Sequence, residues 1–262
     1  MSETVSQPAV IEMEGVQIAS PLDPAQAILE DVNWTVQTGE FWVVAAPEHA
    51  GKTDLLLHAA GLVPPTAGTC RVFGRDTREF DETQLAERLR LGFVFAEGKL
   101  FSQMTLAENI ALPLRYHRDL PEAEMVRTTE RLLELLELTP FASALPVNVA
   151  ANWRQRAALA RALALEPEVL LLDNPNGGLV VRHRRWLVDF LDQLWRGHEF
   201  IGNRPMTVVA TTDDLQAWQH AGRKFAAVHE GTFATLGTWG GDEFSRNGAI
   251  KELLAAATEA QR

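Results

Sequence analysis

The chain contains one cysteine, Cys70, among its 262 residues, so no disulfide can form within it. This excludes the small disulfide-stabilised secreted folds and is typical of a reducing compartment. No apolar run approaches the roughly 18 consecutive residues that a membrane-spanning helix needs. Residues 1–10 also lack the basic and apolar regions of a secretory signal. We therefore expect a cytoplasmic protein that reaches a membrane only through a partner.

Positive charge is in deficit, with 24 Lys and Arg against 35 Asp and Glu, which gives a formal net charge of -11. A general nucleic-acid binder needs a basic surface to neutralise phosphates, so we expect no nucleic acid among the partners. The apolar fraction of 46% is that of an ordinary globular protein. A chain of this length can bury one α/β core, alone or with a small subdomain.

Short apolar runs alternate with helical patterns along most of the chain. Strands are expected at residues 9–18, 27–36, 41–45, 70–73, 91–95, 169–172, 207–210, 226–228 and 232–234. Helices are expected at residues 55–62, 82–90, 104–115, 122–138, 154–165, 184–195 and 250–260. This pattern predicts one α/β domain over residues 1–262, with a central, mostly parallel sheet and flanking helices. Residues 1–95 and 154–262 would form the core with an N-terminal antiparallel β subdomain, and about 97–153 a helical subdomain.

The apolar run at residues 41–45 leads into Gly51-Lys52-Thr53 and then into a helix. This order is typical of a phosphate-binding loop, in which backbone N–H groups and a helix N-terminus face the phosphates, a lysine reaches the outer phosphates, and a hydroxyl binds Mg²⁺. The predicted nucleotide-binding residues are Pro47, Glu48, His49, Ala50, Gly51, Lys52, Thr53 and Asp54.

Two positions of this loop depart from the usual pattern. Ala46 stands where glycine is expected, and a residue forced into the left-handed region there would cost roughly 1–2 kcal/mol. His49 lies in the middle of the loop, where its imidazole could contact a phosphate or face solvent.

Asp173 follows the apolar strand at residues 169–172. A carboxylate at such a strand end can hold Mg²⁺ through water beside a phosphate loop. Thr53 and Asp173 are thus the predicted Mg²⁺ ligands, and ATP is the predicted nucleotide.

The order of these motifs resembles the ATP-binding subunits of ABC transporters. The resemblance rests on residues 154–163, which read Arg-Gln-Arg-Ala-Ala-Leu-Ala-Arg-Ala-Leu, on Glu166-Pro167, and on residues 174–179. It implies a P-loop NTPase fold of the ABC type and a dimer with itself or with a second ABC ATP-binding subunit. It also implies an integral-membrane permease as partner, on the inner face of the cell membrane. Residues 108–115 and 249–254 are most similar to the Mla-type subgroup that serves phospholipid-trafficking permeases, which implies a lipid or organic-solvent cargo.

Several functional positions of the family are changed in this chain. Ala96 replaces the glutamine that senses Mg²⁺, Asn174 the catalytic glutamate, and Thr212 the switch histidine. Val180 replaces an aspartate of the dimer contact. The family's signature loop is changed as well, with Trp153 adding bulk, and its equivalents are Val149, Ala150, Ala151, Asn152 and Trp153.

These changes predict that no catalytic residue is intact. The amide of Asn174 cannot take a proton from water, and loss of a general base typically costs about 10²–10⁴-fold in rate. A homodimer would have two doubly impaired sites, whereas a heterodimer with an intact partner would have two singly impaired ones.

Alternatives remain open at this stage. The chain could be a pseudo-ATPase that regulates or scaffolds, or its loop could stay empty with Lys52, Thr53 and Asp173 satisfied by local hydrogen bonds. Another class of phosphate-loop enzyme, such as a kinase, is disfavoured by the helix at residues 154–163.

Overall fold

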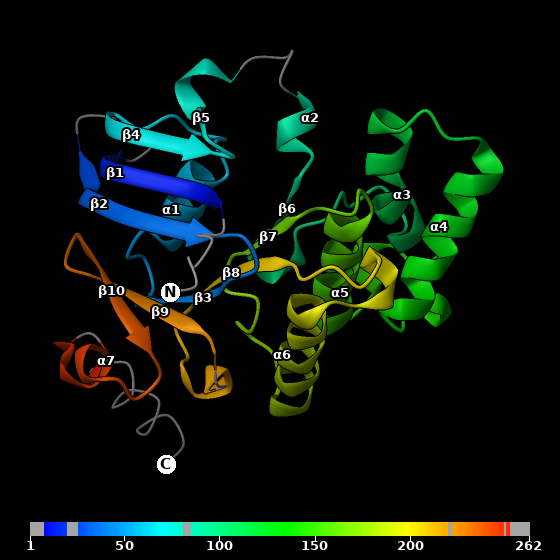
Figure 1. Ribbon diagram of the computed structural model, residues 1–262. Helices are drawn as coiled ribbons and strands as arrows, with labels where there is room; N and C mark the ends of the chain where they lie inside the picture. Colours follow the sequence, from blue (N-terminus) through cyan, green and yellow to red (C-terminus); the bar gives the residue numbers. More distant parts are fainter. Residues whose placement is uncertain (1–7, 20–25, 81–84, 220–221, 249, 252–262) are drawn as a thin grey trace, which may run out of the picture.

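The computed structural model describes residues 8–19, 26–80, 85–219, 222–248 and 250–251, and within these ranges the chain builds two sheets (Figure 1). The first sheet is antiparallel, with strand order β2-β1-β4-β5. Its strands are β1 (Ala9–Ala19), β2 (Ala27–Gln37), β4 (Ala67–Val72) and β5 (Arg75–Asp76). Buried and exposed residues alternate along much of β2, as expected for a strand with one face on the core.

The second sheet has strand order β10-β9-β3-β8-β7-β6 and is parallel except for the β9–β10 hairpin. Its strands are β3 (Phe41–Ala45), β6 (Leu91–Val94), β7 (Val169–Leu172), β8 (Thr207–Thr212), β9 (Lys224–His229) and β10 (Thr232–Thr238). Ala45 pairs with Thr212, and Leu172 pairs with Ala210. The carboxyl ends of β3, β7 and β8 therefore meet at one edge of the sheet.

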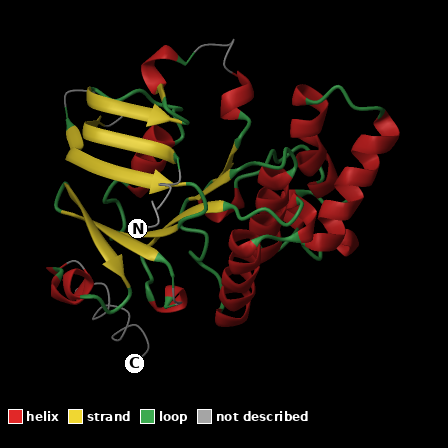
Figure 2. Ribbon diagram, viewed as in Figure 1, coloured by secondary structure: helices red, strands yellow, loops and turns green. Residues whose placement is uncertain are grey.

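Helices surround the second sheet and extend to one side of it (Figure 2). The α-helices are α1 (Lys52–Ala59), α2 (Leu85–Arg88), α3 (Leu106–His117), α4 (Glu122–Leu135), α5 (Ala151–Leu163), α6 (Val181–Arg196) and α7 (Asp242–Arg246). The 3₁₀ helices are η1 (Thr77–Glu79), η3 (Ala96–Gly98), η4 (Thr139–Phe141), η5 (Pro146–Asn148), η6 (Glu199–Ile201) and η7 (Gln216–Trp218). Helix α3 packs against both α4 and α5. No helix in the described ranges has the length and hydrophobicity to cross a membrane.

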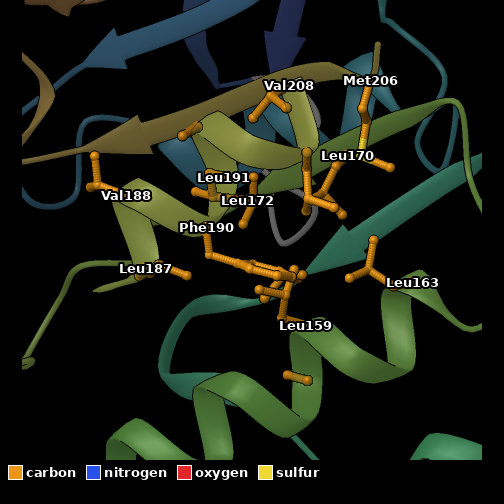
Figure 3. Close-up of a cluster of buried hydrophobic side chains, with 14 of the residues drawn as sticks. Leu159, Leu163, Leu170, Leu172, Leu187, Val188, Phe190, Leu191, Met206 and Val208 are labelled. Carbon is orange, nitrogen blue, oxygen red and sulfur yellow. The ribbon is translucent and has the colours of Figure 1, made fainter. Parts of the chain in front are cut away.

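Strand β7 is buried on both faces, and alternate residues belong to different apolar clusters. Leu170 and Leu172 join the cluster formed with α5 and α6, where Leu159 and Phe190 also lie (Figure 3). Leu171 belongs to the opposite cluster, formed with α1 and the first sheet. Burial on both faces explains why the strand reads as a continuous apolar run.

The predicted α/β fold, with its mostly parallel sheet, antiparallel β sheet and helical region, is confirmed. The limits of about 97–153 for a helical subdomain remain a prediction. The predicted terminal helix at residues 250–260 lies mostly outside the described residues, as does the start of the predicted helix at 82–90. The described part of the latter is helical only over Leu85–Arg88.

One boundary affects the site directly. The helix expected to begin at Arg154 begins instead at Ala151. Ala151, Asn152 and Trp153, predicted to belong to a loop, therefore form its first turn. None of these three residues is a glycine, so nothing in this segment opposes extension of the helix.

Candidate nucleotide site

The phosphate loop connects β3 to α1, and its last residue needs to be glycine. Gly51 is the N-cap of α1 and has φ 88° and ψ 20°, in the left-handed region. A Cβ at this position would lie 2.5 Å from Cγ2 of Ile28 on β2. The loop is tied to the sheet edge at its other end, where the N–H of Ala46 donates to the carbonyl of Thr212 over 2.9 Å. Backbone N–H groups in the first turn of α1 have no intrahelical acceptor, so they are available to a bound anion.

The strained position in the loop is His49 and not Ala46. Ala46 is fully buried and does not have a positive φ, which corrects the expectation of strain at that residue. His49 is exposed and has φ 63°. The left-handed conformation thus falls in mid-loop, where a side chain can point to solvent.

Lys52 is only 8% exposed, and its ammonium is bound by the loop itself. Nζ donates to the carbonyl oxygens of Ala46 at 3.0 Å and Pro47 at 2.6 Å. Burial lowers the pKa of Lys52, and the nearby charges of Asp213, Asp173 and Glu48 oppose that shift, Asp213 most strongly. The lysine is therefore placed among carboxylates, at the point where a nucleotide's outer phosphates would be held.

The two predicted Mg²⁺ ligands are in direct contact. Thr53 Oγ1 donates to Asp173 Oδ2 over 2.6 Å, and Asp173 Oδ1 accepts from Thr211 Oγ1 at 3.1 Å. Among the residues that the structure describes, no three His, Cys, Asp or Glu side chains form a metal-binding group. One hydroxyl and one carboxylate fit Mg²⁺ only when phosphates and water complete its shell, which is how Mg²⁺ accompanies a nucleotide.

Asn174, directly after Asp173, is held by the end of β8. Its N–H donates to Thr211 Oγ1 at 3.0 Å, and its side-chain Nδ2 donates to Asp213 Oδ2 at 2.9 Å. Its Oδ1 is buried and has no hydrogen-bond partner in the described structure. The residue next to the Mg²⁺ carboxylate therefore presents a fixed amide.

A cavity of about 490 Å³ opens beside these residues. Ala96 and Asn174 line it together, whereas Thr212 lies outside it. Thr212 is fully buried, and its hydroxyl both donates to the Asp214 carbonyl at 2.9 Å and accepts from the Asp214 N–H at 3.0 Å. The cavity also carries four carboxylates, from Glu48, Glu97, Asp213 and Asp214.

Comparison with known proteins decides the family. The ABC transporter family model matches residues 29–177, which is more than half of the chain. The chain belongs to the ABC transporter family.

Curated ABC relatives cover most of this chain. The sulfate/thiosulfate import ATP-binding protein CysA of Mycobacterium bovis is 36% identical over 210 residues, which cover 80% of this chain and 57% of the relative. CysA of Caulobacter vibrioides is 38% identical over 213 residues, with coverage of 80% and 60%. The aliphatic sulfonates import ATP-binding protein SsuB of Bacillus licheniformis is 34% identical over 202 residues, with coverage of 77% and 72%. The chain thus spans less than two thirds of the length of the CysA relatives.

Solved structures confirm the ABC-type P-loop NTPase fold. The dimeric post-hydrolysis state of the ATP-binding cassette MJ0796, bound to ADP and Pi, superposes with a TM-score of 0.74 at 27% identity. The match covers 85% of this chain and 95% of that chain. A second dimeric MJ0796 structure gives the same TM-score at 28% identity.

The equivalents of the ABC signature loop are distributed around the start of α5. Val149 and Ala150 precede the helix, and of the five residues only Ala151 lines the cavity. The bulk of Trp153 is directed into its own subunit, where its ring centroid lies 4.7 Å from that of Phe141. The guanidinium of Arg156 lies 4.8 Å from the centroid of the same indole ring.

The groups that surround Asn174 were not predicted from the sequence. Asp213 and Asp214 line the cavity, and Thr211 binds both Asp173 and Asn174. A signal for them exists, because two carboxylates follow directly after the apolar strand that ends at Thr212. Such side chains lie at the edge of the sheet that carries the phosphate loop.

Proposed function

We propose that this chain is an ATP-binding subunit of an ABC-type membrane transporter that holds nucleotide and hydrolyses it very slowly or not at all. The observation that carries the proposal is the hydrogen bond from Asn174 Nδ2 to Asp213 Oδ2. It fixes an amide where the family has its catalytic glutamate, beside a preformed pair of Thr53 and Asp173. The site thus combines the groups for binding with a non-basic group for catalysis.

Binding would use three side chains and the loop backbone. Lys52 would exchange its two carbonyl partners for phosphate oxygens, while Thr53 and Asp173 would hold Mg²⁺. Bound Mg²⁺ would supply positive charge to the outer phosphates. The Gly51 N-cap and the first turn of α1 would present N–H groups to the inner phosphates.

Hydrolysis would lack its main proton acceptor. Asn174 has no basic atom, and its buried Oδ1 cannot accept a proton near neutral pH. The hydroxyl of Thr212 is bound to Asp214, and Ala96 offers only a methyl group. Loss of general-base help costs about 10²–10⁴-fold, and these separate losses do not multiply because the groups act as a unit.

A membrane permease and a second ATP-binding subunit are the proposed partners, with the chain on the cytoplasmic face of the membrane. The dimeric MJ0796 cassettes and the import proteins CysA and SsuB support this assignment by relationship. Indications of cargo differ. Residues 108–115 favour a lipid or organic solvent, whereas the relatives' names point to sulfate, thiosulfate or aliphatic sulfonates.

A regulatory or scaffolding pseudo-ATPase is the second candidate, since the fixed amide at Asn174 suits a subunit that binds nucleotide without turnover. The two candidates share the site and differ in partner. Purification of the tagged chain from detergent-solubilised membranes distinguishes them. A co-purifying permease supports the transporter subunit, and a soluble complex without one supports the pseudo-ATPase.

The site is tested by calorimetric titration of Mg-ATP into the full chain, with phosphate release measured in parallel. We expect binding that is lost in Lys52→Ala and turnover well below the roughly 1–10³ s⁻¹ of ordinary enzymes. Lys99→Ala is the matched control, because it removes an exposed lysine outside the loop. Absence of binding heat, binding that survives Lys52→Ala, or rapid turnover would each contradict the proposal.

A further inference from the structure

The residues that line the cavity include buried amides without hydrogen-bond partners. Gln155 and Asn176 line it, and they are only 4% and 3% exposed. In the described structure Gln155 Nε2 and both amide atoms of Asn176 have no partner, and neither does Asn174 Oδ1. Native proteins pair nearly all such buried groups, so these atoms indicate that the cavity holds a polar ligand or ordered water.

Arg154 adds a positive charge that no carboxylate neutralises. Its Nη1 donates to the Val149 carbonyl at 2.8 Å, and among the described residues it forms no ion pair. It lies near the start of α5, directly before Gln155, and Ala151 at the start of the same helix also lines the cavity. The first turn of α5 has no acidic residue and no side-chain cap, so its N–H groups add to the positive potential. One wall of the cavity therefore presents hydrogen-bond donors.

Two of the four carboxylates of the cavity already have partners. Arg184 donates to Asp214 Oδ2 at 2.5 Å. Asp213 accepts from Asn174 Nδ2 at 2.9 Å. Asp213 is also the charge that acts most strongly on the Lys52 ammonium. These two carboxylates are therefore balanced by groups other than Arg154.

The other two carboxylates do not neutralise Arg154 either. Glu48 belongs to the phosphate loop, where its charge also acts on Lys52. Glu97 is exposed, so water screens its charge. The guanidinium of Arg154 is thus available to an anion in the cavity.

Donors of these kinds match a small oxyanion. A guanidinium presents its N–H groups as a planar fork that fits the oxygens of a phosphate, and amide N–H groups can bind the remaining oxygens. A divalent cation does not fit, because in the described part of the chain no three His, Cys, Asp or Glu side chains are grouped to hold a metal. The cavity, at about 490 Å³, also has room for water between the ion and its wall.

The unpartnered acceptors discriminate among oxyanions. Asn174 Oδ1 and Asn176 Oδ1 can each accept from a P–OH group, which inorganic phosphate retains near neutral pH. Sulfate has no such hydrogen. A phosphate ester loses its last proton with a pKa of about 6, so the terminal phosphate of a nucleotide is mostly without one. Both of these ions would leave the two amide oxygens unpaired.

We propose that this cavity is a binding site for free inorganic phosphate, held by Arg154, Gln155 and Asn176 and separate from the phosphate loop. The site does not depend on the proposed nucleotide binding, because it uses neither Lys52 nor Mg²⁺. Bound phosphate would bridge the turn that follows β7 and the start of α5.

The experiment is a titration of the full chain with inorganic phosphate near neutral pH and at constant ionic strength, followed by the line width of the phosphorus NMR signal. We expect saturable binding. Sulfate should compete at least about tenfold less well, because it leaves buried acceptors unpaired. Arg154→Met should weaken phosphate binding at least about tenfold by removing a charged donor.

Gln155→Leu is the second variant, and it should weaken phosphate binding at least about threefold by removing one neutral donor. Thermal melting establishes that each variant is folded. The matched control is Arg246→Met, which removes an exposed arginine of α7 outside the cavity and should leave phosphate binding unchanged. Unchanged phosphate binding in folded Arg154→Met and Gln155→Leu variants would overturn the inference.

Lys52→Ala tests the location of the ion. Phosphate binding should stay within about threefold of the wild type, because Lys52 does not line the cavity. Loss of phosphate binding in this variant but not in Arg154→Met would place the ion in the phosphate loop and overturn the inference.

Three further results would also overturn it. These are absence of saturable phosphate binding, equal affinity for sulfate, and displacement of phosphate by Mg-AMP-PNP, a triphosphate analogue that resists hydrolysis, but not by Mg-ADP. The last result would assign the cavity to the terminal phosphate of a nucleotide. None of these results contradicts the proposed nucleotide binding, which is tested by its own titration.

Discussion

Thr53 Oγ1 lies 2.6 Å from Asp173 Oδ2, so a hydrogen bond joins the phosphate loop to the end of β7 across 120 positions of the chain. The second carboxylate oxygen accepts from Thr211 on β8. Asp173 is therefore held from two sides before any ligand arrives. A prearranged pair of this kind reduces the ordering cost of binding a metal.

Thr53→Val should weaken the Mg²⁺-dependent part of nucleotide binding by about tenfold, because valine keeps the shape of threonine but has no hydroxyl to donate or coordinate. Thr53→Ser should retain most of that dependence. The measurement is a Mg²⁺ titration at fixed ADP concentration. Equal Mg²⁺ dependence in the valine variant and the wild type would show that this hydroxyl plays no part in the metal site.

Asn174→Glu should restore little hydrolysis and should destabilise the fold. The new carboxylate would face Asp213 Oδ2, where the amide now donates over 2.9 Å, and two partly buried like charges at this distance repel. We expect a loss of about 1–3 kcal/mol in the free energy of unfolding. Asn174→Glu with Asp213→Asn should recover most of it.

Denaturant unfolding and phosphate release test this prediction together. The isosteric control Asn174→Leu shows which effects of replacing Asn174 do not depend on Asp213. Robust turnover in the Asn174→Glu single variant would show that the other changed positions, Ala96 and Thr212, do not limit hydrolysis.

Arg156 should be a major contributor to stability where α5 meets α6. It is 5% exposed, it donates to Glu137 Oε2 at 2.6 Å, and its guanidinium lies 3.4 Å from the Trp186 ring centroid. Arg156→Ala removes the stacking and leaves the Leu136 carbonyl without this donor. The expected loss is about 2–4 kcal/mol, measured by denaturant unfolding.

Glu137→Gln is the matched control for that pair. The Glu137 side chain is 60% exposed, so removal of its charge should cost under about 1 kcal/mol. Equal losses in the two variants would assign the stabilisation to the ion pair and not to the stacking.

Cys70 should be almost unreactive in the folded chain. Burial raises the pKa of its thiol from 9.0 to about 12, and Sγ donates to the His58 carbonyl at 3.4 Å. At pH 8 we expect labelling by Ellman's reagent at least about 100-fold slower than in guanidinium chloride, because only the thiolate reacts. The raised pKa also means that this group's contribution to stability is complete below pH 9 and is lost as the pH rises toward 12. Rapid native labelling at pH 8 would contradict the burial of this side chain.

The nucleotide- and Mg²⁺-binding residues could be predicted from the sequence because they are identified by the order of neighbouring elements along the chain. A strand, Gly51-Lys52-Thr53 and a helix are consecutive, and Asp173 directly follows its own apolar strand. Contact between Thr53 and Asp173 then follows from the general rule that carboxyl ends of parallel strands meet at one edge.

The other features of the site could not be predicted, because they depend on strand register and side-chain packing, and a local sequence pattern determines neither. The bond from Asn174 to Asp213 needs β7 and β8 adjacent and parallel, with Leu172 opposite Ala210. Trp153 turns toward Phe141 because α5 begins three residues earlier than its helical pattern indicates. The non-glycine residue of the loop with a positive φ is His49 and not Ala46, because the path of the whole loop sets the backbone angles.

In the second sheet, the residues that stabilise the fold lie within the strands, and the residues that determine the chemistry lie just beyond the strand ends. Leu170 and Leu172 are packed inside the protein, whereas Asp173 and Asn174 come just beyond the strand end. Replacement of Asp173 or Asn174 removes no side chain from this apolar cluster. In a protein of this architecture, a few point changes at one edge of the sheet can therefore convert a subunit that hydrolyses ATP into one that only binds nucleotide, or the reverse.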